Sequence, residues 1–183
     1  MLAVTGYKTT INQRLMKLLP SEEFVRFGEL TDYSSCERYM FAAGLMHSKG
    51  ILDQTYAQIY ESMRVNLIDV MRHCERVLEL NKTARICVIG SESAILGSYD
   101  QIYAVAKAGL HAYVRTRRVL PTQSLACVAP PIIADSGMTS RRHDYPEVLE
   151  KRRTVKAAQV AALVVETLYS PVLLGRTVVE LMP

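Results

Sequence analysis

Short apolar runs alternate with amphipathic stretches along the whole chain. Runs at 2–4, 24–27, 38–43, 84–89, 125–129 and 176–181 have the length and composition of buried strands. Between them, apolar residues recur at helical spacing over 10–19, 53–80, 101–118 and 155–169. This alternation predicts an α/β domain with a mainly parallel sheet that is covered on both faces.

Local signals place the ends of several elements. Thr9 or Thr10 can cap the first helix, and Pro20 ends it. Thr154 can cap a last helix that runs from Val155 to Tyr169. The stretch 90–100 is rich in serine and glycine and 132–147 contains few periodic positions, so both are expected to be mainly loop. Without an internal repeat or linker, residues 1–183 are expected to form a single domain.

Composition indicates the compartment in which the protein is expected. The chain is 49% hydrophobic, but no apolar stretch approaches the roughly 20 residues that span a bilayer. The start, Met1 to Val4, lacks the charged end and the long apolar centre of a signal peptide. We therefore expect a cytoplasmic protein with no membrane partner. The cysteines are scattered along the chain, which favours buried apolar residues in a reducing compartment. Neither the cysteines nor the histidines have the spacing of metal ligands.

The net charge of +4 comes with three basic clusters, at 115–118, 141–143 and 151–153. A nucleic-acid-binding surface would combine such clusters with exposed aromatic residues or set them on one recognition helix. The chain has three phenylalanines and no tryptophan. Solvated helix ends and loops explain the clusters better, so no nucleic-acid partner is expected.

Tyr103 and Lys107 form the most informative pair of residues. At positions i and i+4 of a helix they share a face, and Ser91 precedes the tyrosine by 12 residues, just after an apolar run. A tyrosine is a poor base at its usual pKa of about 10, and an ammonium beside it lowers that pKa. A nearby hydroxyl that holds a substrate oxygen would complete a site for carbonyl–alcohol chemistry. The pair alone is a weak signal, because it also occurs on solvated helices.

With the elements in this order, the chain resembles the short-chain dehydrogenase/reductase family from Tyr39 to Leu181, and more loosely before that. The matching segments, in chain order, are Phe41–Gly44, Val65–Leu67, Ile89–Ser91, Tyr103 with Lys107, Val128–Ile133 and Gly175–Val179. The resemblance implies a three-layer, Rossmann-like, doubly wound parallel sheet, and an NAD(P)-dependent oxidoreductase.

The resemblance also implies roles for individual residues. Tyr103 would be the general acid/base, and Lys107 would lower its pKa and bind the nicotinamide ribose. Ser91 would polarise the substrate carbonyl, with Ser93 as a rival for that role. Asn66 would kink its helix and hold a water that relays protons to Lys107. The residues implied to bind NAD or NADP are Gly6, Thr10, Ile11, Leu30, Ala42, Ala43, Gly44, Tyr103, Lys107, Pro130 and Ile133.

The chain departs from the family in its first part. Thr5 and Gly6 match the start of the family pattern Thr-Gly-x-x-x-Gly-x-Gly. At the positions of its two later glycines, this chain has Thr10 and Asn12. The stretch from Thr5 to Phe41 is also too short for two crossover helices and a further strand. We expect an abbreviated nucleotide half. The strand at 24–27 is assigned to the position that contacts the adenine, through Glu29 to Asp32, and the strand that ends near the adenosine ribose is expected to be absent.

Three functions fit these observations. The first is NAD(P)-dependent oxidation or reduction of a small or apolar alcohol or carbonyl. The choice between NAD and NADP is not readable: Arg26 hints at a phosphate, and the alternative is a simple surface charge. The second is a family-derived binding or assembly protein without turnover, and the third is a binder of another nucleotide. The helices that begin at Asp53 and Gln101 correspond to the family's dimer-forming pair, so a homodimer or homotetramer is expected.

Overall fold

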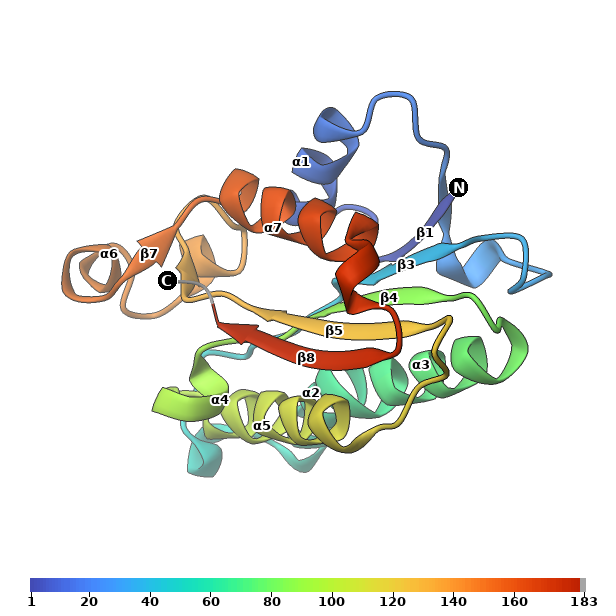
Figure 1. Cartoon of the computed structure of the whole chain (residues 1–183). Helices are drawn as coiled ribbons and strands as arrows, with labels where there is room; N and C mark the ends of the chain where they lie inside the picture. The colour runs from blue at the N-terminus through green and yellow to red at the C-terminus, as the bar shows by residue number, and fades with distance from the viewer. Residues whose placement is uncertain (182–183) are drawn as a thin grey trace.

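A parallel sheet forms the centre of the molecule, and the computed structural model describes residues 1–181 (Figure 1). The strands are β1 (Leu2–Thr5), β2 (Phe24–Arg26), β3 (Arg38–Phe41), β4 (Arg85–Ile89), β5 (Ser124–Ala129), β6 (Ile132–Ile133), β7 (Thr154–Val155) and β8 (Arg176–Leu181). Six of them form one sheet in the order β2-β1-β3-β4-β5-β8, and all neighbours are parallel. β6 and β7 pair separately.

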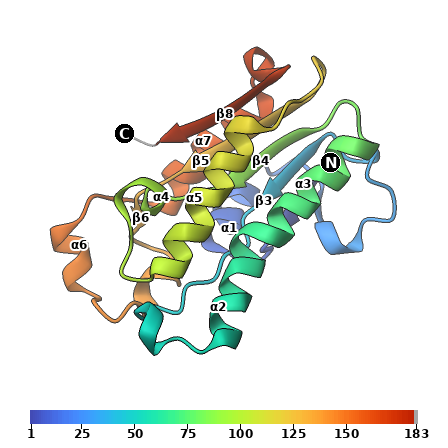
Figure 2. The ribbon, with the colours of Figure 1, turned by 90° about the horizontal axis from the view of Figure 1, so that it is seen from below.

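Helices cover both faces of this sheet. They are α1 (Thr10–Leu18), α2 (Tyr56–Met63), α3 (Asp69–Leu80), α4 (Ser93–Leu96), α5 (Gln101–Thr116), α6 (Glu147–Lys151) and α7 (Ala157–Tyr169). α1 and α7 lie on one face, and α2, α3 and α5 lie on the other (Figures 1 and 2). The structure confirms the expected three-layer α/β fold. No helix within residues 1–181 is long and apolar enough to cross a bilayer.

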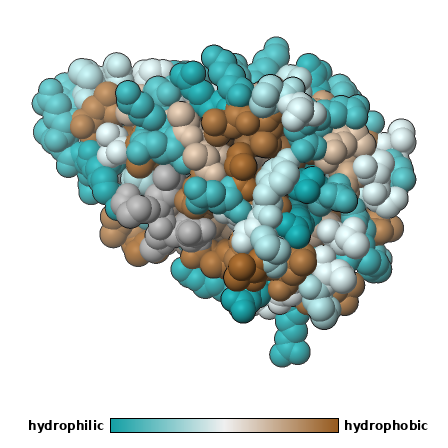
Figure 3. All heavy atoms as spheres, turned by 45° about the horizontal axis from the view of Figure 1, so that its top comes forward, coloured by the Kyte–Doolittle hydropathy of each residue, from teal (hydrophilic) through white to brown (hydrophobic). Residues whose placement is uncertain are grey.

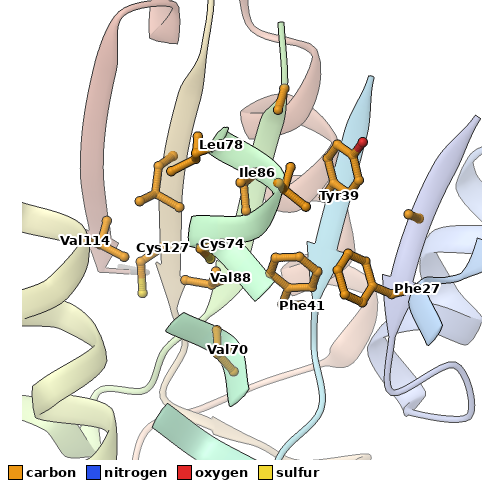
Figure 4. Packing of buried hydrophobic residues seen from close by; sticks show 14 of the residues in the cluster. Phe27, Tyr39, Phe41, Val70, Cys74, Leu78, Ile86, Val88, Val114 and Cys127 are labelled. Atoms are coloured by element: carbon orange, nitrogen blue, oxygen red, sulfur yellow. The ribbon is translucent and has the colours of Figure 1, made fainter. Parts of the chain in front are cut away.

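The core is divided by the sheet into two layers. Side chains alternate along each strand, so Met40 packs under α1 and α7 while its neighbours Tyr39 and Phe41 pack under α3. Figure 4 shows the second layer, in which Phe27, Phe41 and Val88 lie against the inner face of α3. Because helices bury both faces of the sheet, the sequences of β4 and β5 are nearly continuous apolar runs.

The position of β2 corrects one expectation. β2 pairs directly with β1, so it occupies the place of the strand that ends near the adenosine ribose, and the outer strand is the missing one. The connection from β2 to β3 contains only a short 3-10 helix, Phe27–Glu29, instead of a full helix. The N-terminal half is therefore abbreviated, as expected, but strand pairing decides which strand is lost.

Two helix boundaries also differ from the expectation. The predicted helix 53–80 begins at Tyr56 behind a Thr55 capping box, and a π-helical segment, Arg64–Ile68, divides it into α2 and α3. The predicted cap at Thr154 is wrong. Thr154 and Val155 pair with β6, and α7 begins at Ala157, because the backbone hydrogen bonds of this short sheet replace a first helical turn.

Candidate functional site

A cavity of about 950 Å³ opens at the carboxyl ends of the central strands. Its walls come from the turn after β1, from residues 42–44 after β3, from residues 89–93 after β4 and from residues 130–133 after β5. Loops at this edge of a doubly wound sheet are where such folds bind their ligands. The cavity is large enough for a cofactor together with a small substrate.

One face of α5 points its polar side chains into the protein. Tyr103, Lys107 and His111 are spaced four residues apart and are 9%, 3% and 1% exposed. Lys107 Nζ donates a 2.7 Å hydrogen bond to the carbonyl oxygen of Ile89, at the end of β4, and lies 5.7 Å from the centre of the Tyr103 ring. Burial lowers the pKa of Lys107 to about 8. α5 thereby brings an amine and a phenol to the same side of the cavity.

The pKa of Tyr103 differs from the sequence expectation. Burial raises it above its usual value, and a hydrogen bond with Ser91 and the positive charge of Arg142 oppose that rise. The sequence predicts that an ammonium four residues away lowers this pKa, but burial of the phenol is the larger effect and the net shift is upward. The physical reason is that Lys107 points toward the carbonyl of Ile89, while the buried phenol loses its solvation.

Ser91, and not Ser93, is the serine that pairs with Tyr103. The Ser91 hydroxyl accepts a 3.1 Å hydrogen bond from the backbone N–H of Ser93, which begins α4. This short helix lies inside the stretch that was expected to be a loop. The geometry therefore joins Ser91, Tyr103 and Lys107 and leaves Ser93 as a support for Ser91.

His111 supports the site from behind, a role that the sequence did not reveal. Its Nε2 accepts a 3.4 Å hydrogen bond from the backbone N–H of Ser91, and a Cβ on Gly90 would lie 2.4 Å from the same nitrogen. Burial, together with the nearby charges of Arg115 and Lys107, lowers the pKa of His111 to about 4. A neutral His111 therefore fixes the end of β4. Its spacing one turn beyond Lys107 was an available signal.

Asp100 is the second residue that sequence analysis missed. Its carboxylate is 1% exposed and caps α5 by accepting a 3.1 Å hydrogen bond from the backbone N–H of Tyr103. It also accepts hydrogen bonds from the backbone N–H groups of His47 and Ser48 and from the side chain of Gln54. An aspartate directly before a helix is a typical cap, so this role was open to prediction.

Asn66 lies in the π-helical segment and is fully buried. Its Nδ2 donates to the carbonyl oxygens of Leu45 and Ser62, at 2.6 and 2.9 Å, and its Oδ1 accepts from the backbone N–H of Leu45 at 3.2 Å. The amide therefore joins the long helix to the segment after β3. The helix is irregular at this residue, as expected, and the asparagine does not face solvent.

The turn after β1 shows how the two altered glycine positions are accommodated. Gly6 has a φ of 63°, and a Cβ there would lie 2.9 Å from the backbone nitrogen of Ala43. The Asn12 side chain folds back and donates to the carbonyl oxygens of Thr5 and Gly6, at 2.8 and 2.9 Å. Asn12 thus braces the turn and does not line the cavity, whereas Thr10 does.

Most of the residues that the sequence assigns to a cofactor surround the cavity. Those that line it are Gly6, Thr10, Ile11, Ala42, Ala43, Gly44, Tyr103, Lys107, Pro130 and Ile133. Leu30 does not. It packs against the buried core layer beneath α3, because the 3-10 turn after β2 directs the chain toward that layer. Leu30 therefore lies outside the cavity, and its assignment to the cofactor stays a prediction.

Arg26 joins the main cavity to a smaller one. It ends β2, and its guanidinium carbon lies 5.0 Å from the centre of the Tyr7 ring. A second cavity of about 680 Å³ shares Gly6, Tyr7 and Arg26 with the first, and Arg72 and Arg76 of α3 also line it. Within residues 1–181, no group of histidine, cysteine, aspartate or glutamate side chains is arranged to hold a metal ion.

Comparisons with known proteins give a match in structure only. No family model matches the chain, and no curated protein matches its sequence. A short-chain dehydrogenase/reductase of the glucose/ribitol dehydrogenase type from Brucella melitensis has a TM-score of 0.78 at 18% identity, over 98% of this chain and 94% of that chain. The ligand-free aldohexose dehydrogenase of Thermoplasma acidophilum has a TM-score of 0.79 at 14% identity, over 99% and 91%.

A third structure contains a dinucleotide. It is a short chain dehydrogenase from Burkholderia cenocepacia in complex with NADP, with a TM-score of 0.76 at 16% identity, over 99% of this chain and 95% of that chain. At such low identities the likeness concerns the fold.

The low pKa of His111 predicts a loss of stability in acid. In the unfolded chain His111 binds a proton near pH 6.5, and in the folded chain only near pH 4. The free energy of unfolding is therefore highest above pH 6.5 and decreases as the pH falls toward 4. The expected loss at pH 4 is about 3 kcal/mol. Urea unfolding from pH 7 to 4 measures it. His111→Gln should flatten this dependence and the exposed His143→Gln should not; equal slopes in all three proteins would refute the assignment.

Proposed function

We propose that this chain, which has the fold of short-chain dehydrogenases/reductases, is a member of that family and an NAD(P)-dependent oxidoreductase that interconverts a carbonyl and an alcohol. The observation that carries the proposal is the convergence of Ser91, Tyr103 and Lys107 on one cavity at the carboxyl end of the sheet. A protein that only binds or assembles does not need these three groups together.

The shape and polarity of the cavity support a dinucleotide. At Gly6 no side chain covers the backbone beside Ala43. The first turn of α1 contains no acidic residue. A helix N-terminus of this kind favours a phosphate group. Because Asn12 folds away from the cavity, the altered glycine turn does not block this position. The residues after β3 and β5 would hold the rest of the dinucleotide.

The proposed mechanism assigns one task to each side chain. The dinucleotide supplies or accepts the hydride when it is bound. Ser91 holds the substrate oxygen with its hydroxyl. Tyr103 gives its proton to that oxygen during reduction and takes it back during oxidation. Lys107 fixes the end of β4 and, as an ammonium below about pH 8, favours the phenolate that remains after proton transfer.

The cofactor is proposed to be NADP. In dinucleotide-binding folds, an acidic residue near the end of the second strand binds the ribose 2′-hydroxyl of NAD, and an arginine there accommodates the 2′-phosphate of NADP. Arg26 ends β2 and extends over Tyr7. Arg26 also forms a 3.4 Å ion pair with Glu29, but both side chains are more than half exposed. This ion pair therefore competes only weakly with a phosphate for the guanidinium. Arg72 and Arg76 add positive charge to the adjoining cavity.

We also propose a homodimer through α2 and α5, which lie side by side on one face (Figure 2). Leu52, Tyr56 and Tyr60 are 96%, 92% and 66% exposed, and Val105 of α5 is 57% exposed, although helical spacing alone suggests that it is buried. Apolar side chains this exposed in one area indicate a contact surface. Gly109 contacts Leu67 within the chain, so its close packing does not itself argue for a dimer. Cys36, Cys74 and Cys127 are buried free thiols, which supports a cytoplasmic setting.

The first test combines binding and turnover. Titration with NADPH and NADH, followed by nucleotide fluorescence, should show saturable binding. Tyr103→Phe should keep that binding while the reduction of carbonyl substrates falls about 10²–10⁴-fold, because only the proton donor is removed. Turnover equal to wild type in this variant would refute the role of Tyr103. Failure of both nucleotides to bind at millimolar concentration would favour a protein that assembles without turnover, and binding of a different nucleotide would favour the third function.

The second test concerns cofactor preference. Wild-type protein should bind NADPH at least about tenfold more tightly than NADH, because a guanidinium–phosphate contact is a strong, charge-assisted hydrogen bond. Arg26→Glu should remove that preference without weakening NADH binding. The exposed Lys17→Glu makes the same charge change outside both cavities and should behave as wild type. An unchanged preference in Arg26→Glu would contradict the proposed role.

The third test concerns assembly. Light scattering at tens of micromolar should give twice the chain mass of 20.5 kDa, or a multiple of that dimer. Tyr60→Glu places a charge in the proposed contact surface and should shift the mass to that of one chain. Leu120→Glu, at an exposed site away from this surface, is the control. A monomeric wild-type protein would overturn the dimer.

A further inference from the structure

The segment from residue 136 to residue 153 lies over the cavity and carries most of its positive charge. Its cationic residues that line the cavity are Arg141, Arg142, Lys151, Arg152 and Arg153. In the sequence these belong to two of the basic clusters that were expected to be solvated. The end of the molecule that contains α6 is mostly hydrophilic in the space-filling view (Figure 3). The structure therefore places the two clusters at the mouth of the candidate active site.

Charges on this segment are sorted by sign. Glu147 and Glu150 of α6 do not line the cavity, whereas the cationic side chains do. The two acidic residues that line it, Glu92 and Asp144, are each bound by an arginine. A solvated helix end has no reason to sort its charges in this way. The excess of positive charge is therefore a property of the cavity.

Arg142 lies closest to the chemistry. Its Nε and Nη2 donate to the two carboxylate oxygens of Asp144 at 2.7 and 2.8 Å, which holds the guanidinium in a fixed plane. The side chain is 14% exposed, and its charge acts on the Tyr103 hydroxyl. Its Nη1 has no hydrogen-bond partner within the described residues. This donor is therefore available to a ligand that also reaches Tyr103.

Arg141 is the second candidate donor. Its Nε donates to the carbonyl oxygen of Gly137 at 2.8 Å, and its terminal nitrogens form no ion pair with a described residue. The next residues, Arg142 and His143, are tied down. His143 shares two hydrogen bonds with Ser48, at 3.1 and 3.2 Å, and its ring lies 4.2 Å from that of Tyr99. The two arginines are thus held over the cavity by contacts with the other loops around it.

The phosphates of a dinucleotide do not account for this charge. By the sheet order, the turn after β1 and the end of β2 lie at one side, and they supply Lys8 and Arg26. The pyrophosphate of a dinucleotide lies at the start of α1, beside this turn. Arg141 and Arg142 follow β5 instead, and Arg142 lies near enough to Tyr103 for its charge to act on the hydroxyl. A second anion, separate from the cofactor, fits there.

We propose that the substrate carries an oxyanion, a carboxylate or a phosphate, which Arg141 and Arg142 bind while its carbonyl or alcohol group meets Tyr103. The inference rests on the proposed oxidoreductase function and names its substrate class. A guanidinium recognises such anions with paired, charge-assisted hydrogen bonds. The two arginines bind and position the substrate, and Tyr103 transfers the proton.

The test uses the full chain saturated with NADPH and matched pairs of carbonyl compounds. Pyruvate, acetoacetate and 4-oxopentanoate are compared with their methyl esters, and dihydroxyacetone phosphate is compared with dihydroxyacetone. NADPH oxidation and the thermal midpoint of the NADPH complex are both measured. At least one anionic member should give a kcat/KM at least about tenfold above its neutral partner and should raise the midpoint. The acid and phosphate arms identify which anion is preferred.

Variants separate this role from general damage. Arg141→Gln and Arg142→Gln should each raise KM for the preferred anion about tenfold, a larger loss than for its neutral partner. Arg142→Lys should recover part of the loss, because it keeps the charge but not the planar fork. Arg118→Gln, an exposed arginine beyond α5, is the control.

Three outcomes would overturn the inference: neutral compounds used as well as anions, no response to any anion in either measurement, or equal losses for both members of a pair in the arginine variants. NADPH binding is measured first on the same samples. If NADPH binds and anions show no preference, only this inference fails. If neither dinucleotide binds, the proposed function itself fails.

Discussion

The carboxylate of Asp100 is the constraint on which the candidate site depends. It is buried at the head of α5 and accepts four hydrogen bonds, from the backbone of Tyr103, His47 and Ser48 and from Gln54. The three backbone N–H groups would lose this acceptor without it, and an unsatisfied buried group costs about 1–3 kcal/mol. The same contacts fix the first turn of α5 against the loop that precedes α2. The position of Tyr103 is therefore set by residues far from it in the sequence.

The shortened N-terminal half leaves this arrangement intact. The missing strand would lie outside β2, at the edge of the sheet, whereas the cavity is walled by the loops after β1, β3, β4 and β5. Its loss leaves a second cavity open beside α3, where Arg72 and Arg76 lie. A doubly wound sheet can thus lose an edge strand and still form the crevice in which such sheets bind their ligands.

The sequence predicted the central elements well because their signals are local. Apolar runs, the Thr9 cap and the four-residue spacing of Tyr103 and Lys107 depend on neighbours within one or two turns. The packing of Leu30 against the core could not be predicted, because a single 3-10 turn decides whether it faces the crevice or the core. Thr154 was misread as a cap because its pairing with β6, more than 20 residues earlier, cannot be seen locally.

The sequence by itself determined the alternation of strands and helices and the shared face of the phenol and the amine, since both follow from backbone periodicity. Only the tertiary structure decided that burial raises the pKa of Tyr103, that Asn12 braces the turn after β1, and that basic residues after β5 surround the cavity. Solvation, strand pairing and charge sorting depend on contacts between distant residues. Such contacts exist only once the chain is folded.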